Sequence, residues 1–174
     1  GHQEYGRRAG TENISGIVGM GAACELAQIH LPGMAQTGLL RDRLERRLQA
    51  CVPSVMVMGG GQPRVPGTLN LAFEFIEGEA ILLLLNQVGI AASSGSACTS
   101  GSLEPSHVMR AMNIPYTAAH GTIRFSLSRY TREKEMDYVI AMLPPIVESL
   151  RALSPYWQDG RPHPTADAFT PVYG

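Results

Sequence analysis

Cysteine is scarce in this 174-residue sequence, and none of it is paired. Cys24, Cys51 and Cys98 form no Cys-x-x-Cys motif and are odd in number. The pattern indicates neither a disulfide framework nor a metal site, and it leaves at least one free thiol. Cys24 and Cys51 lie in apolar periodic segments, so we expect both to be buried structural residues.

The sequence also lacks an excess of charge and a long hydrophobic run. It carries 14 basic and 15 acidic residues, a balance that favours neither a nucleic-acid surface nor a polybasic membrane patch. The longest apolar run, Ala80–Leu85, is far shorter than the ~20 residues that cross a bilayer. The N-terminus has no charged-then-apolar signal pattern. We therefore expect a cytoplasmic protein that binds neither nucleic acid nor membrane.

Lysine is almost absent. Of the 14 basic residues 13 are arginines, and Lys134 is the only lysine. It lies in the segment TREKEMD, the charged first turn of an expected amphipathic helix, where its side chain should be solvated. Any chemistry that needs a lysine on this chain therefore depends on this one residue.

What the sequence does contain predicts one α+β domain. Helical spacing of apolar residues predicts helices over 14–29, 36–51, 77–88, 105–112 and 132–150. Alternating or short apolar segments predict strands over 54–58, 68–76, 90–92 and 122–128. Thr131 is the expected cap of the last helix, and residues 154–174 form a tail that wraps the surface. This order favours helices packed on one face of a small, mostly antiparallel sheet.

Cys98 stands in a segment that cannot form a core. Residues 92–101 read ASSGSACTSG, so the thiol is surrounded by small, hydroxylic or flexible residues. A thiol on an exposed turn can ionise and react; the alternative is a serine- and glycine-rich linker that contains a cysteine. His107 and His120 stand in no spacing diagnostic of a cysteine protease, and the GGGQPR stretch lacks the ending of a phosphate-binding loop.

Three separated motifs carry a family resemblance. They are GRRAGTEN (6–13), SSGSACTSGSLEPSHV (93–108) and HGTIRFSLSRYT (120–131). In this order they resemble the C-terminal part of the NifS-type, pyridoxal-phosphate-dependent cysteine desulfurases, which belong to the class V aminotransferase superfamily. The GRRAGTENI form and the LRALSPYW ending are more similar to the nitrogen-fixation branch.

The resemblance implies a domain organisation. Residues 1–174 would form the small C-terminal domain of a fold-type-I enzyme, with part of the connection to a cofactor-binding domain that this sequence does not contain. Within it, 93–102 would be the catalytic cysteine loop and 154–174 the C-terminal tail.

The resemblance also implies roles for individual residues. Cys98 matches the family's catalytic cysteine, which takes sulfur from L-cysteine as a persulfide and leaves L-alanine; a small-residue loop suits a thiol that collects sulfur and delivers it. Arg124 matches the residue that holds the substrate carboxylate, a task that suits a guanidinium fork; its alternative is a surface salt-bridge arginine. Thr11 matches a threonine that reaches the cofactor phosphate of the other subunit, and by sequence alone it is a candidate cap of the first helix, as are Asn13 and Ser15. Arg8 is expected to shape that loop.

The implied cofactor is pyridoxal phosphate, which is carried on a lysine. The family's cofactor lysine, its stacking histidine and the aspartate that pairs with the pyridine nitrogen belong to the half that this sequence lacks. We therefore expect the chain alone to be inactive as a desulfurase. The full protein is expected to be a homodimer that passes sulfur from L-cysteine to an iron–sulfur scaffold protein, for nitrogenase.

Two other functions stay open. One is a cofactor-free sulfur carrier or scaffold-docking module, for which the carboxylate-binding Arg124 would have no use. The other is a selenocysteine lyase or another class V aminotransferase, in which the loop cysteine is not essential. A Cys98→Ser variant of the complete enzyme separates the second alternative from a cysteine desulfurase.

Overall fold

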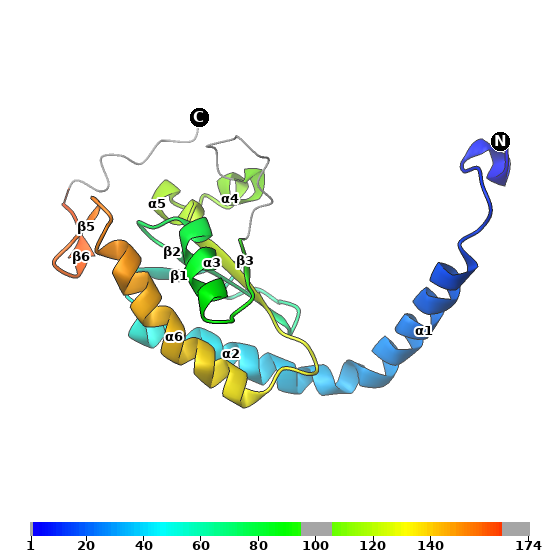
Figure 1. Cartoon of the computed structure of the whole chain (residues 1–174), viewed down its shortest axis with the longest axis horizontal. Helices are drawn as coiled ribbons and strands as arrows, with labels where there is room; N and C mark the ends of the chain where they lie inside the picture. The colour runs from blue at the N-terminus through cyan, green and yellow to red at the C-terminus, as the bar shows by residue number, and fades with distance from the viewer. Residues whose placement is uncertain (1, 95–105, 165–174) are drawn as a thin grey trace. The chain divides into compact units, whose positions relative to one another are not determined.

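The structure is a computed structural model that describes residues 2–94 and 106–164 (Figure 1). The chain divides into two compact units, residues 1–34 and 35–174, and each is described by itself.

The first unit contains one long helix, α1 (Ile14–His30), between two short 3-10 turns, Glu4–Gly6 and Leu31–Gly33. Asn13 caps α1, because its Oδ1 atom accepts a hydrogen bond from the Gly16 N–H at 3.1 Å. The prediction of a helix from residue 14 is confirmed, whereas the helix cap is Asn13 rather than Thr11.

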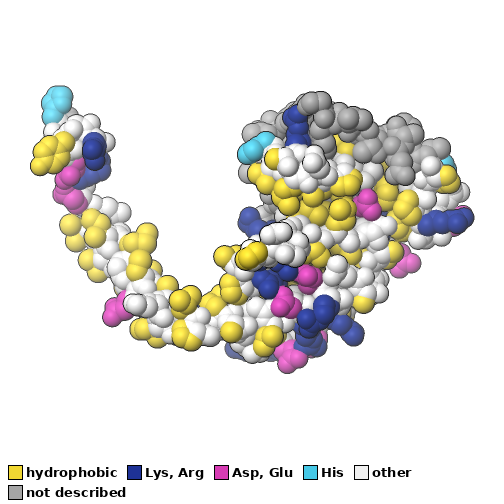
Figure 2. All heavy atoms as spheres, turned by 180° about the vertical axis from the view of Figure 1, so that it is seen from behind, with side chains coloured by type: hydrophobic (Ala, Val, Ile, Leu, Met, Phe, Trp, Pro, Cys, Tyr) yellow, Lys and Arg dark blue, Asp and Glu magenta, His cyan; other side chains and the backbone are white. Residues whose placement is uncertain are grey.

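Helix α1 is apolar on every side. None of its residues is buried, and Figure 2 shows hydrophobic side chains along its length. The large exposed side chains are Ile14, Ile17, Val18, Met20, Leu26 and Ile29. A helix that is apolar all round belongs in a protein core or a membrane, and the described residues of the first unit leave the apolar surface of α1 uncovered.

By length and composition alone, the helical stretch Ile14–Cys51 could cross a membrane, with a mean hydropathy of 1.3 in its 18-residue window. The length of uninterrupted apolar runs did not reveal this stretch, because glycines interrupt the apolar runs of α1 without making it polar. One such helix is weak evidence for a membrane, since core helices and signal sequences share these properties.

The second unit is built on a four-stranded antiparallel sheet with the order β1-β2-β4-β3. Its strands are β1 (Val55–Val57), β2 (Thr68–Phe73), β3 (Ser93–Ser94) and β4 (Thr122–Ser126). The α+β class and the antiparallel sheet are therefore confirmed. The strand expected at 90–92 lies at 93–94 instead, and β2 ends before Phe75, whose φ of 70° is incompatible with a strand.

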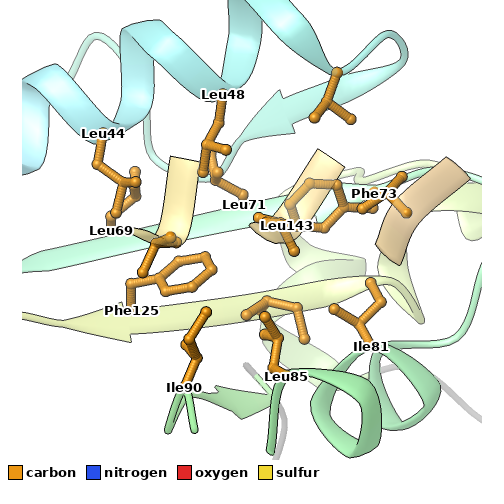
Figure 3. Close-up of a cluster of buried hydrophobic side chains, with 14 of the residues drawn as sticks. Leu44, Leu48, Leu69, Leu71, Phe73, Ile81, Leu85, Ile90, Phe125 and Leu143 are labelled. Atoms are coloured by element: carbon orange, nitrogen blue, oxygen red, sulfur yellow. The ribbon is translucent and has the colours of Figure 1, made fainter. Parts of the chain in front are cut away.

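Three helices cover one face of this sheet: α2 (Met34–Cys51), α3 (Gly78–Gln87) and α6 (Glu133–Arg151). The alternation along β2 and β4 turns one side chain in two toward these helices. Figure 3 shows the resulting core, in which side chains from α2 and α3 meet those of the two strands. The fully buried members include Leu44, Leu48, Leu69, Leu71, Phe73, Ile81, Leu85, Ile123 and Leu143.

The opposite face of the sheet is partly covered by two short helices, α4 (His107–Ala111) and α5 (Tyr116–Ala119). They form a second apolar cluster with β1 and β2, made of Met56, Met58, Ala72, Met109, Ile114, Ala118 and Ala119. The expectation that the helices pack on only one face of the sheet is therefore wrong in part. The four residues of α5 are too few for a helical period, so the sequence pattern did not predict it.

The start of α6 and the tail also differ from expectation. Helix α6 follows Arg132, whose N–H donates to the Glu135 carboxylate at 2.7 Å, whereas the Thr131 hydroxyl oxygen accepts from the Ser128 N–H in the preceding turn. After α6 the chain forms a hairpin of β5 (Trp157–Gln158) and β6 (Arg161–Pro162). The rest of the predicted tail, from residue 165, lies outside the described residues.

Arg151, at the end of α6, joins three segments of the second unit. Its side chain is 2% exposed and donates to the main-chain oxygens of Pro53 at 2.7 Å, Ser54 at 2.9 Å and Glu74 at 3.2 Å. The guanidinium also lies 4.2 Å from the ring centroid of Trp157. Burial lowers the pKa of Arg151 to about 10, so the group stays charged at neutral pH.

Cys24 and Cys51 are both exposed, so the expectation that they are buried is wrong. Cys24 lies on α1, which buries no residue, and Cys51 is the last residue of α2. Apolar periodicity identified their helices correctly, but it does not reveal whether another element covers the position.

Candidate functional site

Arg124 lies in the middle of β4 with its side chain exposed, between buried Ile123 and Phe125. The alternation of the strand therefore holds the guanidinium on the face opposite the main core. Among the ion pairs of the described residues, none involves Arg124, so the alternative of a surface salt-bridge arginine has no support in the described part of the chain.

Polar side chains flank Arg124 on both neighbouring strands. The register pairs Arg124 with Asn70 of β2 on one side and with Ser93 of β3 on the other. Paired residues of an antiparallel sheet point to the same face. The three side chains therefore form one row across the sheet, and the Ser93 hydroxyl donates within its own strand, to the Ser94 main-chain oxygen at 3.1 Å.

The main-chain hydrogen bonds show which kind of pair Asn70 and Arg124 make. The Asn70 main-chain oxygen accepts from the Met58 N–H at 2.9 Å, so the main-chain groups of Asn70 face away from β4. Asn70 and Arg124 are therefore a non-hydrogen-bonded pair, whose Cα atoms lie closer, at about 4.5 Å, than those of a hydrogen-bonded pair. Their side chains are correspondingly close.

Asn70 is the residue of this row that the sequence analysis missed. Its Oδ1 atom is buried and has no hydrogen-bond partner within residues 2–94 and 106–164. Leaving a buried acceptor unpaired costs about 1–3 kcal/mol. A signal was present in the segment TLNLAFEFI, because asparagine is depleted in strands and here interrupts an apolar one.

Cys98 and the loop 93–102 lie outside the described residues, apart from Ser93 and Ser94. Strand β3, which ends at Ser94, is paired with β4 at Arg124. The chain therefore passes directly beside Arg124 at Ser93, five positions before Cys98 in the sequence.

Thr11 lies in the first unit and is exposed. Its loop is shaped by Arg8, as expected: the guanidinium donates to the Gly10 main-chain oxygen at 2.7 Å and to the Glu12 carboxylate at 2.9 Å. A main-chain hydrogen bond, and then the Arg8 side chain, hold the pKa of Glu12 below its ordinary value. Thr11 and Arg124 belong to different units, so the two candidates are described separately.

The described residues do not fit a pyridoxal-phosphate site. Lys134 is exposed on the first turn of α6, at a cavity of about 440 Å³. The carboxylate in that cavity, Glu135, accepts from the main chain of Arg132, and the Tyr138 hydroxyl donates to the Val88 oxygen at 2.9 Å. A Schiff-base lysine needs desolvation to act as a nucleophile, and this lysine is solvated as expected.

His120 borders a second cavity, of about 350 Å³, formed by α5, the start of α3 and the end of α6. Its ring lies edge-on to Tyr116, with the centroids 4.7 Å apart, and its Nε2 atom is buried without a partner. Residues far apart in the sequence form this cavity, so spacing did not predict it. The described residues contain no group of metal-ligating side chains, either here or elsewhere.

Comparison with known proteins identifies the family. The aminotransferase class-V model matches residues 2–139. The chain is 86% identical, over its whole length, to a cysteine desulfurase of Klebsiella pneumoniae, and 63% identical to cysteine desulfurase NifS of Azotobacter vinelandii. In both cases it covers 44% of the relative, so the chain spans less than half the length of these curated relatives.

Solved structures agree with this. A NifS-like protein from Rickettsia africae matches 85% of the chain with a TM-score of 0.74 at 27% identity, and the chain covers 38% of that protein. Another NifS-like protein matches 86% of the chain with a TM-score of 0.72 at 32% identity, again over 38% of its own length. The mixed helix and sheet architecture therefore fits a fragment of a fold-type-I enzyme. The chain belongs to the aminotransferase class-V family and resembles the NifS-type cysteine desulfurases within it.

Proposed function

We propose that this chain is the sulfur-transferring part of a cysteine desulfurase, which converts L-cysteine to L-alanine and retains the sulfur as a persulfide on Cys98. The observation that carries the proposal is Arg124, exposed on β4 beside the strand that leads to Cys98. The 86% identity to a cysteine desulfurase supports the same reaction.

Arg124 binds the substrate carboxylate with two parallel N–H donors of its guanidinium fork. Its position on a central strand limits main-chain movement, so the bound amino acid is held in one orientation. The described ion pairs leave Arg124 without a carboxylate partner. A substrate carboxylate therefore does not have to displace an internal one.

Cys98 performs the sulfur transfer as a thiolate. Its sulfur attacks the sulfur of the substrate, an S–S bond forms, and the bond between the substrate's Cβ and its sulfur breaks. The electron pair of that bond stays on the carbon, which takes up a proton to become the methyl group of L-alanine. The products are L-alanine and the Cys98 persulfide, and no external oxidant is needed.

The cofactor of the complete enzyme is pyridoxal phosphate, and the lysine that carries it lies outside this chain. The solvated Lys134 supports this assignment, as does the share of the relatives that the chain covers. Residues 1–174 would then be the small C-terminal domain, with 93–102 as the cysteine loop and 154–174 as the tail. Residues 1–174 alone would be inactive as a desulfurase. In a cytoplasmic homodimer Thr11 would reach the cofactor phosphate of the other subunit.

The uncovered helix α1 supports the view that this chain works with more protein than its own residues. Its apolar side chains are exposed all round, a state that a water-soluble protein rarely keeps over a large surface. The acceptor of the persulfide sulfur would be an iron–sulfur scaffold protein. Similarity to NifS supports a role in supplying nitrogenase.

The test uses the full-length enzyme with pyridoxal phosphate, and follows L-alanine release from L-cysteine. Cys98→Ser should abolish release, whereas Cys51→Ser, at an exposed thiol of the second unit, should leave it unchanged. Arg124→Ala should raise KM by roughly 10- to 100-fold, the value of hydrogen bonds to a charged group. Full activity of Cys98→Ser would favour a selenocysteine lyase or another aminotransferase, and no activity in the wild-type enzyme would favour a sulfur carrier.

A further inference from the structure

Asn70 is polar at a position where the described fold has no structural use for a polar side chain. Among the residues that the structure describes, its buried amide oxygen has no partner, and it lies next to the buried, apolar Met58 on one side and Arg124 on the other. An apolar residue of the same shape would avoid the unpaired acceptor. Such local conflicts are expected at functional sites.

Asn70 and Arg124 are chemically complementary. An amide oxygen accepts hydrogen bonds, and a guanidinium has five N–H donors and no acceptor. A carboxylate bound by the fork uses two of these donors, so others remain for a second acceptor. The non-hydrogen-bonded pairing brings the two side chains close together on one face of the sheet.

We infer that Asn70 is the positioning residue of the carboxylate clamp: its Oδ1 atom accepts a hydrogen bond from Arg124 and aims the fork at the substrate. The inference rests on the proposed function, which assigns the clamp to Arg124. No hydrogen bond joins the two side chains in this structure, where Arg124 is exposed. Bonds of this kind commonly tighten only when substrate binds.

The test is the variant Asn70→Leu in the full-length enzyme. If Asn70 positions Arg124, KM for L-cysteine should rise about tenfold while kcat changes by less than about twofold. The reason is that the enzyme binds the substrate and the transition state more weakly by the same amount. The urea midpoint of the variant should equal or exceed that of the wild type, since a buried unpaired oxygen is removed. Thr68→Val, two residues along β2 on the same face, is the matched control and should leave both constants unchanged.

A double-mutant cycle separates positioning from a general effect on the sheet. In an Arg124→Ala background, Asn70→Leu should raise KM no further, because the residue acts only through the guanidinium. Suppose that Arg124→Ala impairs the enzyme as expected. The inference is then overturned if the two substitutions raise KM additively, or if Asn70→Leu alone leaves KM unchanged. If Arg124→Ala left KM unchanged, both the clamp and the inference built on it would fail.

Discussion

Removal of the buried Arg151 side chain should destabilise the second unit strongly. Arg151→Ala takes the donors from the main-chain oxygens of Pro53 and Glu74, whereas the Ser54 oxygen keeps a hydrogen bond from the Glu74 N–H at 3.2 Å. The loss of these two hydrogen bonds from a charged group, at about 1.5–3 kcal/mol each, and of the cation–π contact with Trp157 predicts a loss of about 4 kcal/mol. That is a large share of the ~5–15 kcal/mol that stabilises a typical domain.

The assay is urea unfolding followed by circular dichroism and by the fluorescence of Trp157, the only tryptophan. Arg129→Ala is the matched control, because its guanidinium also lies over an aromatic ring, 4.6 Å from the Tyr130 centroid, but is exposed. The control should change the free energy of unfolding by less than about 0.5 kcal/mol. Equal urea midpoints for Arg151→Ala and the wild type would refute the reasoning.

Three further predictions follow from packing and charge. Leu48 is fully buried, so Leu48→Ala should lower the free energy of unfolding by about 2–5 kcal/mol, whereas Leu39→Ala, at a 61% exposed site on the same helix, should change it by less than about 0.5 kcal/mol in the same urea assay. Gly121→Ala would place a Cβ atom 2.0 Å from a main-chain oxygen of β2. Its melting temperature should fall by about 6–12 °C, and a fall of less than about 2 °C would count against the close approach. Because the pKa of Glu12 is lowered, its contact with Arg8 should persist as the pH falls through the ordinary pKa of a glutamate, and it should be lost only near the lowered pKa. The measurement is an NMR titration of the Glu12 carboxyl carbon. A midpoint at or above the ordinary pKa of a glutamate would contradict the prediction.

Much of the fold could be predicted from the sequence because apolar periodicity is a local property. It located α1, α2, α3, α6, β2 and β4. It misplaced β3, since Ser93 and Ser94 carry no apolar signal and become a strand only by pairing with β4. It also misjudged Cys24, because a periodic apolar position is buried only if another element covers it.

The candidate site could be predicted only in part. Arg124 was identified through the family resemblance, and its exposure on the face of β4 away from the core is a finding of the structure. The neighbour Asn70 could not be predicted to lie beside it, since that depends on the register between two strands far apart in the chain. The unpaired Oδ1 atom becomes evident only once the surrounding residues are in place.

The central claim is that sulfur from L-cysteine is transferred to Cys98. The most direct measurement is the mass of each cysteine-containing peptide after a single turnover of the full-length enzyme without reductant. We predict the mass of one additional sulfur atom on the Cys98 peptide, with one L-alanine released for each sulfur bound. L-alanine release without added sulfur on Cys98, or sulfur on the exposed Cys24 or Cys51 instead, would contradict the account.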